Sequence, residues 1–324
     1  TVNLKDDSGL IAQSILFAQK ASGYKTVHVE TAGTLENYIS ADEKEKLIGL
    51  KLTGKLNTFD YDFMRTMPAL ESVDLAQIDN TTIPASCFKS STIKTVILPL
   101  EAIPDNAFNG SSITSIEIPG SVLSIGASAF EACSSLAGNL VLPEGLQTIG
   151  ERAFYQCKAL TGSLHIPNSV TSLGAYAFYR CFGFTGTLTF GTGITTIPEY
   201  CFCNCSGFTG NLVIPDQVTT IEDSAFRDCE GFNGYLTIGS GISQIGSYVF
   251  SRDIFVSSSY PYSYNLPLQF TKVYCKATTP PDVSTSSFGS SSKYSYLGVP
   301  IGCKTAYDKE PWSSRFTIIE EIEF

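Results

Sequence analysis

Cysteine is the residue type in this sequence whose spacing could support chemistry. The chain has 10 cysteines among 324 residues, and the densest group is Cys201, Cys203 and Cys205. A zinc site needs C-x-x-C type spacing with third and fourth ligands, and neither His28 nor His165 is near this group in the sequence. We therefore expect no metal and no cofactor.

Five cysteines recur at a constant interval, which indicates a structural role. They are Cys133, Cys157, Cys181, Cys205 and Cys229. A small apolar side chain repeated in this way is typical of a buried column, so we interpret these residues as inert core thiols. Cys275 and Cys303 lie outside the column. A disulfide in an oxidising compartment and two free buried thiols are both open for this pair, and free thiols are favoured.

Catalysis has no support in the residue pattern. A nucleophile, a base and an orienting group are required, or paired carboxylates in a cleft, and the chain has only 2 histidines. The glycines belong to a repeat and form no phosphate-binding or nucleophile-elbow motif. We predict that the protein is not an enzyme.

A tandem repeat is the dominant feature of the sequence. One phenylalanine recurs at two shorter spacings and then at equal intervals, at Phe88, Phe108, Phe130, Phe154, Phe178, Phe202, Phe226 and Phe250. Isoleucine or leucine follows the same period at Ile125, Ile149, Leu173, Ile197, Ile221 and Ile245. Such periods indicate a solenoid in which each column of residues becomes a column of core.

Each repeat also contains two apolar residues two positions apart, which places both side chains on one face of a short strand. These pairs are Leu140/Leu142, Leu164/Ile166, Leu188/Phe190, Leu212/Ile214 and Leu236/Ile238. The Ala-Phe-x-x-Cys segment is too short for a long helix and predicts a helical or 3₁₀ turn on the outer side. We predict an α/β solenoid: a right-handed leucine-rich-repeat superhelix with short parallel strands, ~24-residue repeats, atypical caps at both ends and roughly ten coils.

The chain divides into three segments. We assign residues 1–48 to an N-terminal helical cap, because residues 8–22 fit an amphipathic helix and Ser40-x-x-Glu43 fits a capping box. Residues 49–250 form the repeat solenoid. The period fails after Phe250, and Asp253 replaces the expected cysteine, so residues 251–324 are assigned to an irregular repeat and C-terminal cap.

Composition excludes several partners. The net charge is -10, with no basic cluster, so nucleic-acid binding and docking on anionic membranes are not expected. The chain contains no apolar run of membrane-spanning length and starts at Thr1 without a signal sequence. It therefore fits a mature chain from which a leader or lipid anchor was removed.

The outward strand residues between the core columns are the best candidate binding surface, on the concave face of the solenoid. They are Glu117, Asn139, Val141, Ser163, His165, Thr187, Thr189, Asn211, Val213, Tyr235 and Thr237. A merely solvated sheet face is the alternative. Tyr260, Tyr262 and Tyr264 alternate in a break of the repeat and form a candidate binding loop, with packing on the last coil as the alternative.

The frame of residues 164–181, L-H-I-P-N-S-V-T-S-L-G-A-Y-A-F-Y-R-C, resembles the BspA-like leucine-rich-repeat family of bacterial surface proteins. The resemblance covers about residues 70–250. It implies a cell-surface or secreted protein, with an outer-membrane lipoprotein expected and the membrane reached only through a removed N-terminal lipid anchor. Adhesion is reported for some members of the family.

We therefore predict an adhesin-like recognition protein that binds a host or bacterial protein through the concave face. A host matrix protein or mucosal glycoprotein is the expected kind of partner. A glycan-binding surface protein and a structural spacer are the alternatives, and the glycan alternative would require exposed aromatic platforms, of which the concave face offers only Tyr235.

Overall fold

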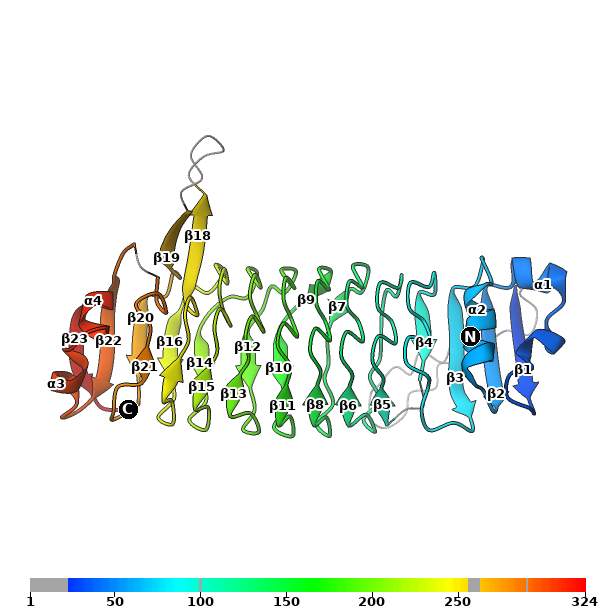
Figure 1. The fold of residues 1–324 in the computed structure, drawn as a ribbon, viewed down its shortest axis with the longest axis horizontal. Coiled ribbons are helices and arrows are strands. Elements are labelled where there is room, and N and C mark those ends of the chain that lie inside the picture. Colours follow the sequence, from blue (N-terminus) through cyan, green and yellow to red (C-terminus); the bar gives the residue numbers. More distant parts are fainter. Residues whose placement is uncertain (1–22, 99–100, 256–262, 290) are drawn as a thin grey trace, which may run out of the picture.

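The computed structural model describes residues 23–98, 101–255, 263–289 and 291–324 of the chain. They form one rod of parallel coils with about 12 turns, more than the sequence indicated. Figure 1 shows the coils in a row, with β1 (Tyr24–Val29) at one end and β23 (Phe316–Ile322) at the other. The predicted repeat solenoid is confirmed, and helices are few.

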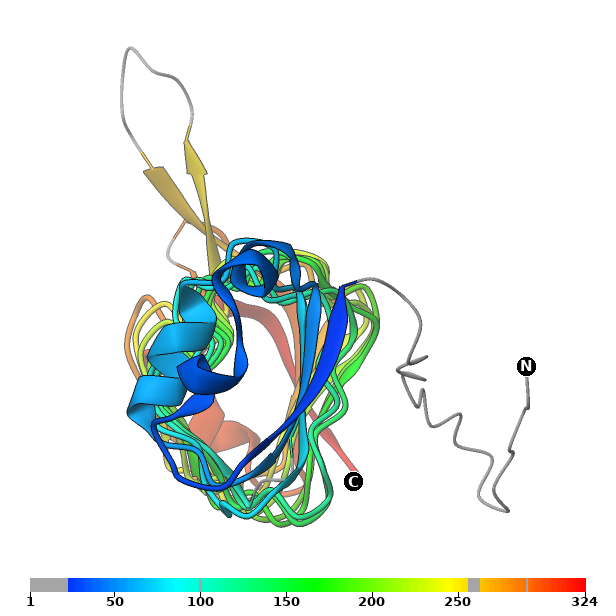
Figure 2. The ribbon, with the colours of Figure 1, turned by 90° about the vertical axis from the view of Figure 1, so that its right-hand side faces the viewer.

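Four parallel strands begin the rod, and three short helices lie beside them. The strands are β1, β2 (Gly49–Gly54), β3 (Ser72–Ile78) and β4 (Thr95–Ile97), paired in that order. The helices are the 3₁₀ helix η1 (Leu35–Tyr38), α1 (Ala41–Lys46) and α2 (Thr58–Arg65), which lie at the near end of the rod in Figure 2. Strand pairing therefore starts at Tyr24, within the segment assigned to the helical cap.

The capping box at the start of α1 is confirmed. Ser40 Oγ accepts from the backbone N–H of Glu43 at 3.3 Å, and the Glu43 carboxylate accepts from the N–H of Ser40 at 2.9 Å. Hydrogen bonds from Lys25 and then Ser40 lower the pKa of the Glu43 carboxyl to about 2. The helix predicted at residues 8–22 lies outside the described residues, so the boundary at residue 48 stays a prediction.

Short parallel strands line two sides of the coils that follow. One side holds β10 (Leu164–Ile166), β12 (Leu188–Phe190), β14 (Leu212–Ile214), β16 (Tyr235–Ile238), β20 (Lys272–Cys275), β22 (Tyr294–Pro300) and β23. The other side holds β5 (Ala102–Ile103), β6 (Ser124–Ile125), β8 (Thr148–Ile149), β11 (Ser172–Leu173), β13 (Thr196–Ile197), β15 (Thr220–Ile221), β17 (Gln244–Ile245) and β21 (Asp282–Val283). Partner residues are one sequence period apart through most of the rod, as the repeat predicts.

One predicted strand is not formed. Leu140 and Leu142 are buried as expected, but residues 140–142 form no strand. The strand of this coil is instead β7 (Gly138–Asn139), which pairs with β9 (Leu160–Thr161) of the next coil. The preceding coil is shorter than the later ones, since Phe108 and Phe130 are closer in the sequence than later neighbours of the column. We attribute the absence of a strand at residues 140–142 to this difference in coil length, because the shorter preceding coil offers no strand in register for it to pair with.

The repeated phenylalanine forms a continuous column of stacked rings inside the rod. Centroids of neighbouring rings are 5.1 Å apart for Phe130 and Phe154 and 5.2 Å apart for Phe154 and Phe178, with planes within 7°. These rings are fully buried. The column is the centre of the core, because burial of each ring depends on the coil above and the coil below it.

The outer segment of each coil is a series of tight turns. Backbone N–H groups of Ala153, Tyr155 and Cys157 donate to carbonyls three residues earlier, as in a 3₁₀ turn. Arg152 and Gln156 have φ of 55° and 59°, which stops the turn from continuing into a helix. The N–H of Arg152 donates to Ala175 in the next coil at 3.0 Å, so this side is also spaced by hydrogen bonds between coils.

The rod is nearly straight in Figures 1 and 2, which we attribute to this construction. A bulky helix on the outer side would hold the coils further apart there than on the strand side and would bend the rod. Here every side has the spacing of paired backbones, about 4.8 Å. The side expected to be concave is therefore called the strand face below.

The Phe column does not end at Phe250, contrary to the expectation. Phe250 stacks on Phe288 at 5.4 Å, although more than one sequence period separates them. β16 pairs with β20 and β17 with β21, so another coil forms in this interval. The additional residues include β18 (Ser251–Phe255) and β19 (Ser263–Pro267), an antiparallel pair that projects from the rod in Figure 1. Asp253 therefore marks an insertion and not the end of the ladder.

An aromatic cluster closes the far end. Phe288, Trp312 and Phe316 contact one another, and the indole N–H of Trp312 donates to the carbonyl of Pro281 at 3.1 Å. The short helices α3 (Lys304–Tyr307) and α4 (Trp312–Arg315) lie in this region. The strands β20 and β23 also belong to this C-terminal segment. In the described residues, no helix has the length and apolar character to cross a bilayer.

Candidate binding surfaces

All eleven residues proposed for the binding surface lie on the strand side between the core columns. Thr237 is half-buried and the other ten are exposed: Glu117, Asn139, Val141, Ser163, His165, Thr187, Thr189, Asn211, Val213 and Tyr235. Val141 is 68% exposed and Val213 is 51% exposed, which is high for apolar side chains. The strand face is thus solvent-accessible along its length.

Strand register arranges part of this face in rows across the coils. In one row, His165 lies opposite Thr189. Further along, Val213 lies opposite Thr237, and Thr237 lies opposite Tyr274. The repeat period therefore produces a flat, ordered array about 40 Å long.

Hydrogen bonds between coils fix several of these side chains. His165 Nδ1 and Thr189 Oγ1 are 2.9 Å apart, and the N–H of Thr187 donates to Ser163 Oγ at 3.0 Å. The N–H of Tyr235 donates to the Asn211 side-chain oxygen at 2.9 Å. A partner that binds here meets side chains that already have defined positions.

The structure extends this face with an aromatic group that the sequence analysis did not identify. Tyr235, Tyr274 and Tyr296 follow one another with ring centroids 5.9 Å and 6.0 Å apart, and Phe324 lies 6.4 Å from Tyr274. Lys272 Nζ is 4.8 Å from the Tyr296 ring centroid. We call these four rings the aromatic end. The alternation of apolar Val273 and Cys275 around Tyr274 was the signal in the sequence that could have revealed it.

The structure describes only part of the candidate binding loop. Tyr260 and Tyr262 lie outside the described residues. Tyr264 was expected in a loop, but its backbone belongs to β19, opposite Ile254. The hairpin forms because the inserted residues pair with the segment that follows Phe250. A binding role for the three tyrosines stays a prediction.

The repeated cysteines are buried, as predicted. Each thiol in the column donates to a phenylalanine carbonyl of the preceding coil; for Cys157, Cys181 and Cys205 the Sγ–O distance is 3.0 Å. Burial raises the pKa of the Cys181 thiol to about 12. A thiol that stays protonated and enclosed is a poor nucleophile and a poor metal ligand.

Cys275 and Cys303 are both free. Cys275 is buried, and the Tyr307 hydroxyl lies 3.3 Å from its Sγ, whereas Cys303 is half-buried. In the described part of the chain, no three His, Cys, Asp or Glu side chains are grouped to hold a metal ion.

The outer turns carry a second surface, which we call the turn face: the exposed or half-exposed side chains within and beside the Ala-Phe-x-x-Cys segments. Tyr155 stacks on Tyr179 with centroids 5.0 Å apart, and Tyr176 stacks on Tyr200 at 4.9 Å. The two stacks touch edge to face, since Tyr176 and Tyr179 are 5.7 Å apart. The Arg152 guanidinium lies 5.5 Å from the Tyr155 ring and 5.4 Å from the Tyr176 ring.

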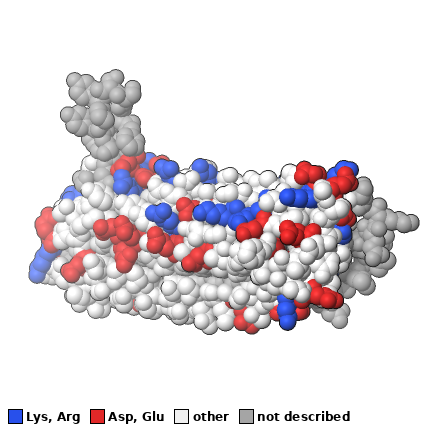
Figure 3. Space-filling view, turned by 45° about the vertical axis from the view of Figure 1, so that its right-hand side comes forward, with Lys and Arg blue, Asp and Glu red and all other residues white. Residues whose placement is uncertain are grey.

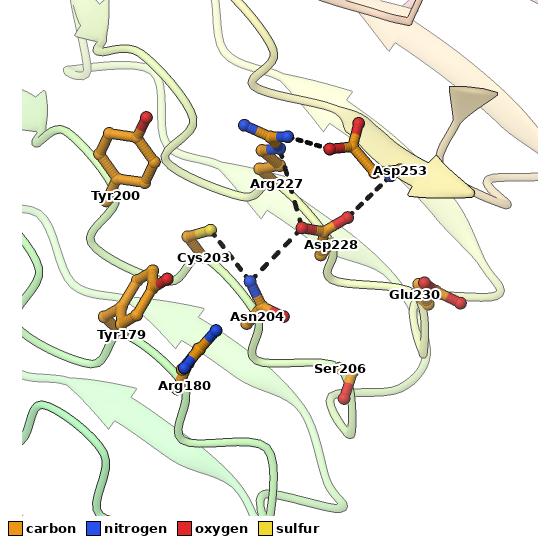
Figure 4. Close-up of a pocket in the computed structure, with 10 residues that line it drawn as sticks. All are labelled: Tyr179, Arg180, Tyr200, Cys203, Asn204, Ser206, Arg227, Asp228, Glu230 and Asp253. Atoms are coloured by element: carbon orange, nitrogen blue, oxygen red, sulfur yellow. Dashed lines mark hydrogen bonds and ion pairs between the residues drawn. The ribbon is translucent and has the colours of Figure 1, made fainter. Parts of the chain in front are cut away.

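A slot opens on the turn face where these stacks end. It has a volume of about 550 Å³ and is lined by Tyr179, Arg180, Tyr200, Cys203, Asn204, Ser206, Arg227, Asp228, Glu230 and Asp253. Figure 4 shows Tyr179 and Tyr200 on one side, opposite Arg227 and Asp253. The slot was not found from the sequence, because its residues occupy variable positions of the repeat. The paired tyrosines one repeat period apart were the available signal.

The charged groups of the slot are bonded to one another. The Arg227 guanidinium donates to Asp253, and the carboxylate of Asp228 accepts from the Asp253 N–H at 2.9 Å and from Asn204 Nδ2 at 3.4 Å. Burial raises the pKa of the Asp228 carboxyl. Figure 3 shows positive and negative side chains mixed in a band along the visible face, without a large area of one sign.

Comparisons with known proteins agree with this architecture. The model of the BspA type leucine rich repeat region matches residues 42–137 and 137–257, with six copies. No curated protein matches the chain.

Several solved structures are similar to the chain. A leucine rich cell surface protein from Faecalibacterium prausnitzii is 22% identical, with 70% of this chain and 76% of that chain covered and a TM-score of 0.37. A leucine-rich repeat protein from Eubacterium ventriosum is 16% identical, with 79% and 89% covered and a TM-score of 0.36. The pneumococcal vaccine antigen PcpA is 15% identical, with 95% and 91% covered and a TM-score of 0.34.

The repeat period, the stacked columns and the family match over most of the chain lead to one conclusion. The chain belongs to the BspA type leucine rich repeat family.

Proposed function

We propose that this chain is a non-enzymatic, adhesin-like recognition protein that binds a host or bacterial protein through the strand face. The observation that supports this most is the continuation of an exposed polar face into the aromatic end. Tyrosine is enriched among the residues that contribute most to protein–protein affinity, and small polar residues around it exclude water and set register.

Preorganisation also supports the proposal. The Thr187 hydroxyl donates to Ser163 Oγ in the neighbouring coil, and the Asn211 side-chain oxygen accepts from the N–H of Tyr235, before any partner binds. Serine, threonine and asparagine lose little side-chain entropy when a partner covers them, compared with lysine or glutamate. A rigid face of about 40 Å matches the span of a standard protein interface.

We further propose that the protein acts at the cell surface or after secretion, held by an N-terminal lipid anchor in the precursor. Membership of a family of bacterial surface proteins supports the surface location. Fractionation of the producing cells, with labelling of surface-exposed protein, tests this. Recovery in the cytoplasmic fraction alone would reject the surface location.

The binding proposal is tested by capture from host extracellular-matrix extract and from mucin, followed by direct affinity measurement with each purified captured protein. One variant replaces Thr187, Thr189 and Asn211 with arginine, and a second carries Tyr274→Ala with Tyr296→Ala. Both folded variants are expected to lose capture.

The matched control is Tyr155→Ala, which removes a tyrosine from the turn face and is expected to keep capture. If the wild-type chain binds no protein directly, or if all three variants bind equally well, the strand face is not the recognition surface and the spacer role gains support.

A further inference from the structure

The tyrosine stacks of the turn face end in successive coils, at Tyr179 beside Phe178 and at Tyr200 beside Phe202. One residue period after Tyr179 the chain has Cys203, and one period after Tyr200 it has Ser224. Both replacements are small and buried, at 2% and 1% exposure. Of the two, Cys203 lines the slot, so the slot lies where the next ring of the Tyr155–Tyr179 stack would lie.

This arrangement leaves one face of each terminal ring toward the slot. Tyr176 covers Tyr200 from the preceding coil with ring planes 8° apart, and Tyr155 covers Tyr179 in the same way at 15°. Both rings line the slot, and they lie edge to face with each other, with centroids 6.4 Å apart and planes 71° apart. An aromatic face of this kind favours a flat, weakly polar surface such as the C–H face of a sugar ring.

The remaining walls supply hydrogen-bond donors and acceptors. Arg180 and Asn204 can donate, while Asp228, Glu230 and Asp253 can accept. Arg227 donates to Asp253 and its Nε lies 3.7 Å from Asp228, so the positive charge on this wall is already neutralised. Each carboxylate oxygen can accept more than one hydrogen bond, so these paired charges suit hydroxyl groups better than a phosphate or a sulfate.

We propose that the slot binds a neutral saccharide unit, with one pyranose ring stacked on Tyr200, Tyr179 beside it at 71° to Tyr200, and the sugar hydroxyls hydrogen-bonded to the polar wall formed by Arg227, Asp228 and Asp253. The size agrees, because a volume of about 550 Å³ accommodates one or two sugar rings and lies within the range of small-ligand pockets. The slot is open to solvent, so a longer glycan extends out of it. This site is separate from the strand face.

The test applies the full chain to an array of neutral and sialylated oligosaccharides and quantifies each hit by titration calorimetry. Cys203→Tyr continues the stack of Tyr155 and Tyr179 by one ring and fills the slot. Tyr200→Ala removes half of the aromatic wall. Each is expected to weaken binding of a neutral oligosaccharide at least tenfold, with thermal unfolding confirming that the variant is folded.

Tyr235→Ala is the matched control, because it removes an exposed tyrosine from the strand face. It is expected to keep saccharide affinity within twofold, while protein capture falls if the proposed function is correct. The two proposals therefore fail independently. If Cys203→Tyr does not fold, Tyr179→Ala and Tyr200→Ala provide the test.

Three results would overturn the proposal. They are no saccharide binding by the wild-type chain, full binding by both slot variants, and preference for a lysine-rich peptide over every glycan tested. Loss of saccharide binding in Tyr235→Ala alone would place the site on the strand face and would likewise reject the slot.

Discussion

The two long surfaces of this rod use the same repeat in different ways. The strand face is flat, and its small side chains are tied to their neighbours by single hydrogen bonds, as with His165 and Thr189. The turn face holds stacked tyrosines, guanidinium groups over rings and a slot. The difference arises because a strand restricts side chains to alternating directions, whereas consecutive tight turns bring several large side chains together.

Backbone conformation explains part of this difference. Tyr176, Arg180, Tyr200 and Asn204 on the turn face all have φ between 53° and 60°. Such residues are strained unless the surroundings hold them, and here N–H groups such as that of Tyr176 donate to the next coil at 3.0 Å. We therefore expect turn-face residues to contribute to stability and strand-face residues to contribute little.

The largest expected effect comes from the column that supports both faces. Phe178→Ala removes a fully buried ring stacked on both sides, and we expect a loss of about 3–5 kcal/mol in the free energy of unfolding. Urea denaturation followed by circular dichroism measures it. A loss below about 1 kcal/mol would mean that the coils do not depend on a continuous column.

The next largest effect on the free energy of unfolding is expected in the cysteine column, and this effect depends on pH. The folded-state pKa of Cys181 is about 12, above the ordinary value of 9.0, so the folded state retains a proton that the unfolded state releases. The contribution of the Cys181 thiol to the stability of the folded state is therefore complete below pH 9 and decreases as the pH rises toward 12. We expect Cys181→Ala to cost about 1–2 kcal/mol at pH 7 and to reduce the alkaline loss of stability.

Thiol labelling provides an independent check of that column. Iodoacetamide at pH 8 should modify Cys181 only after urea is added, because the thiol is fully buried and protonated in the folded rod. Labelling of this residue in the native protein, detected by mass spectrometry, would show that the coils open readily.

A smaller effect is expected on the turn face. Tyr179→Ala removes stacking on Tyr155 and edge contacts with Tyr176, and aromatic pairs contribute about 0.5–1.5 kcal/mol beyond their buried area. Thermal unfolding of the single and double variants with Tyr155→Ala measures the coupling between the two rings. If the two single variants lose amounts of stability that add up to the loss in the double variant, the two rings do not stabilise each other.

The smallest effect is expected on the strand face. Thr189→Ala removes an exposed hydroxyl whose one partner is the His165 ring, so stability should change by no more than about 0.5 kcal/mol. The same unfolding assay applies. A loss equal to that of Tyr179→Ala would remove the distinction between the two faces.

The strictly periodic parts of the molecule could be predicted from the sequence. A column such as that of Phe154 and Phe178 repeats at a constant interval, and stacking coils converts each constant position into a line of contacts. The candidate residues of the strand face were placed on one exposed surface for the same reason, since strand alternation fixes their direction.

The parts that depend on a change of period could not be predicted. Phe288 continues the column only because the intervening residues fold out as a hairpin, and nothing local to Phe288 reveals that length. The slot is lined by Cys203, a small residue at the position where a third tyrosine would continue the stack of Tyr155 and Tyr179. A small side chain at one repeat position forms no recognisable sequence motif. The slot that it leaves appears only when the neighbouring coils are stacked.

Hydrogen bonding between coils also determines how the molecule responds to mechanical tension. Backbone hydrogen bonds such as those between Leu212–Ile214 and Leu236–Ile238 join one coil to the next along the rod, and the first and last strands are at opposite ends in Figure 1. A pull between the ends therefore acts on the coils in series. Each released coil extends to about 80 Å where it occupied about 4.8 Å. Under tension such a protein is expected to lengthen coil by coil, and single-molecule stretching would show this as evenly spaced steps.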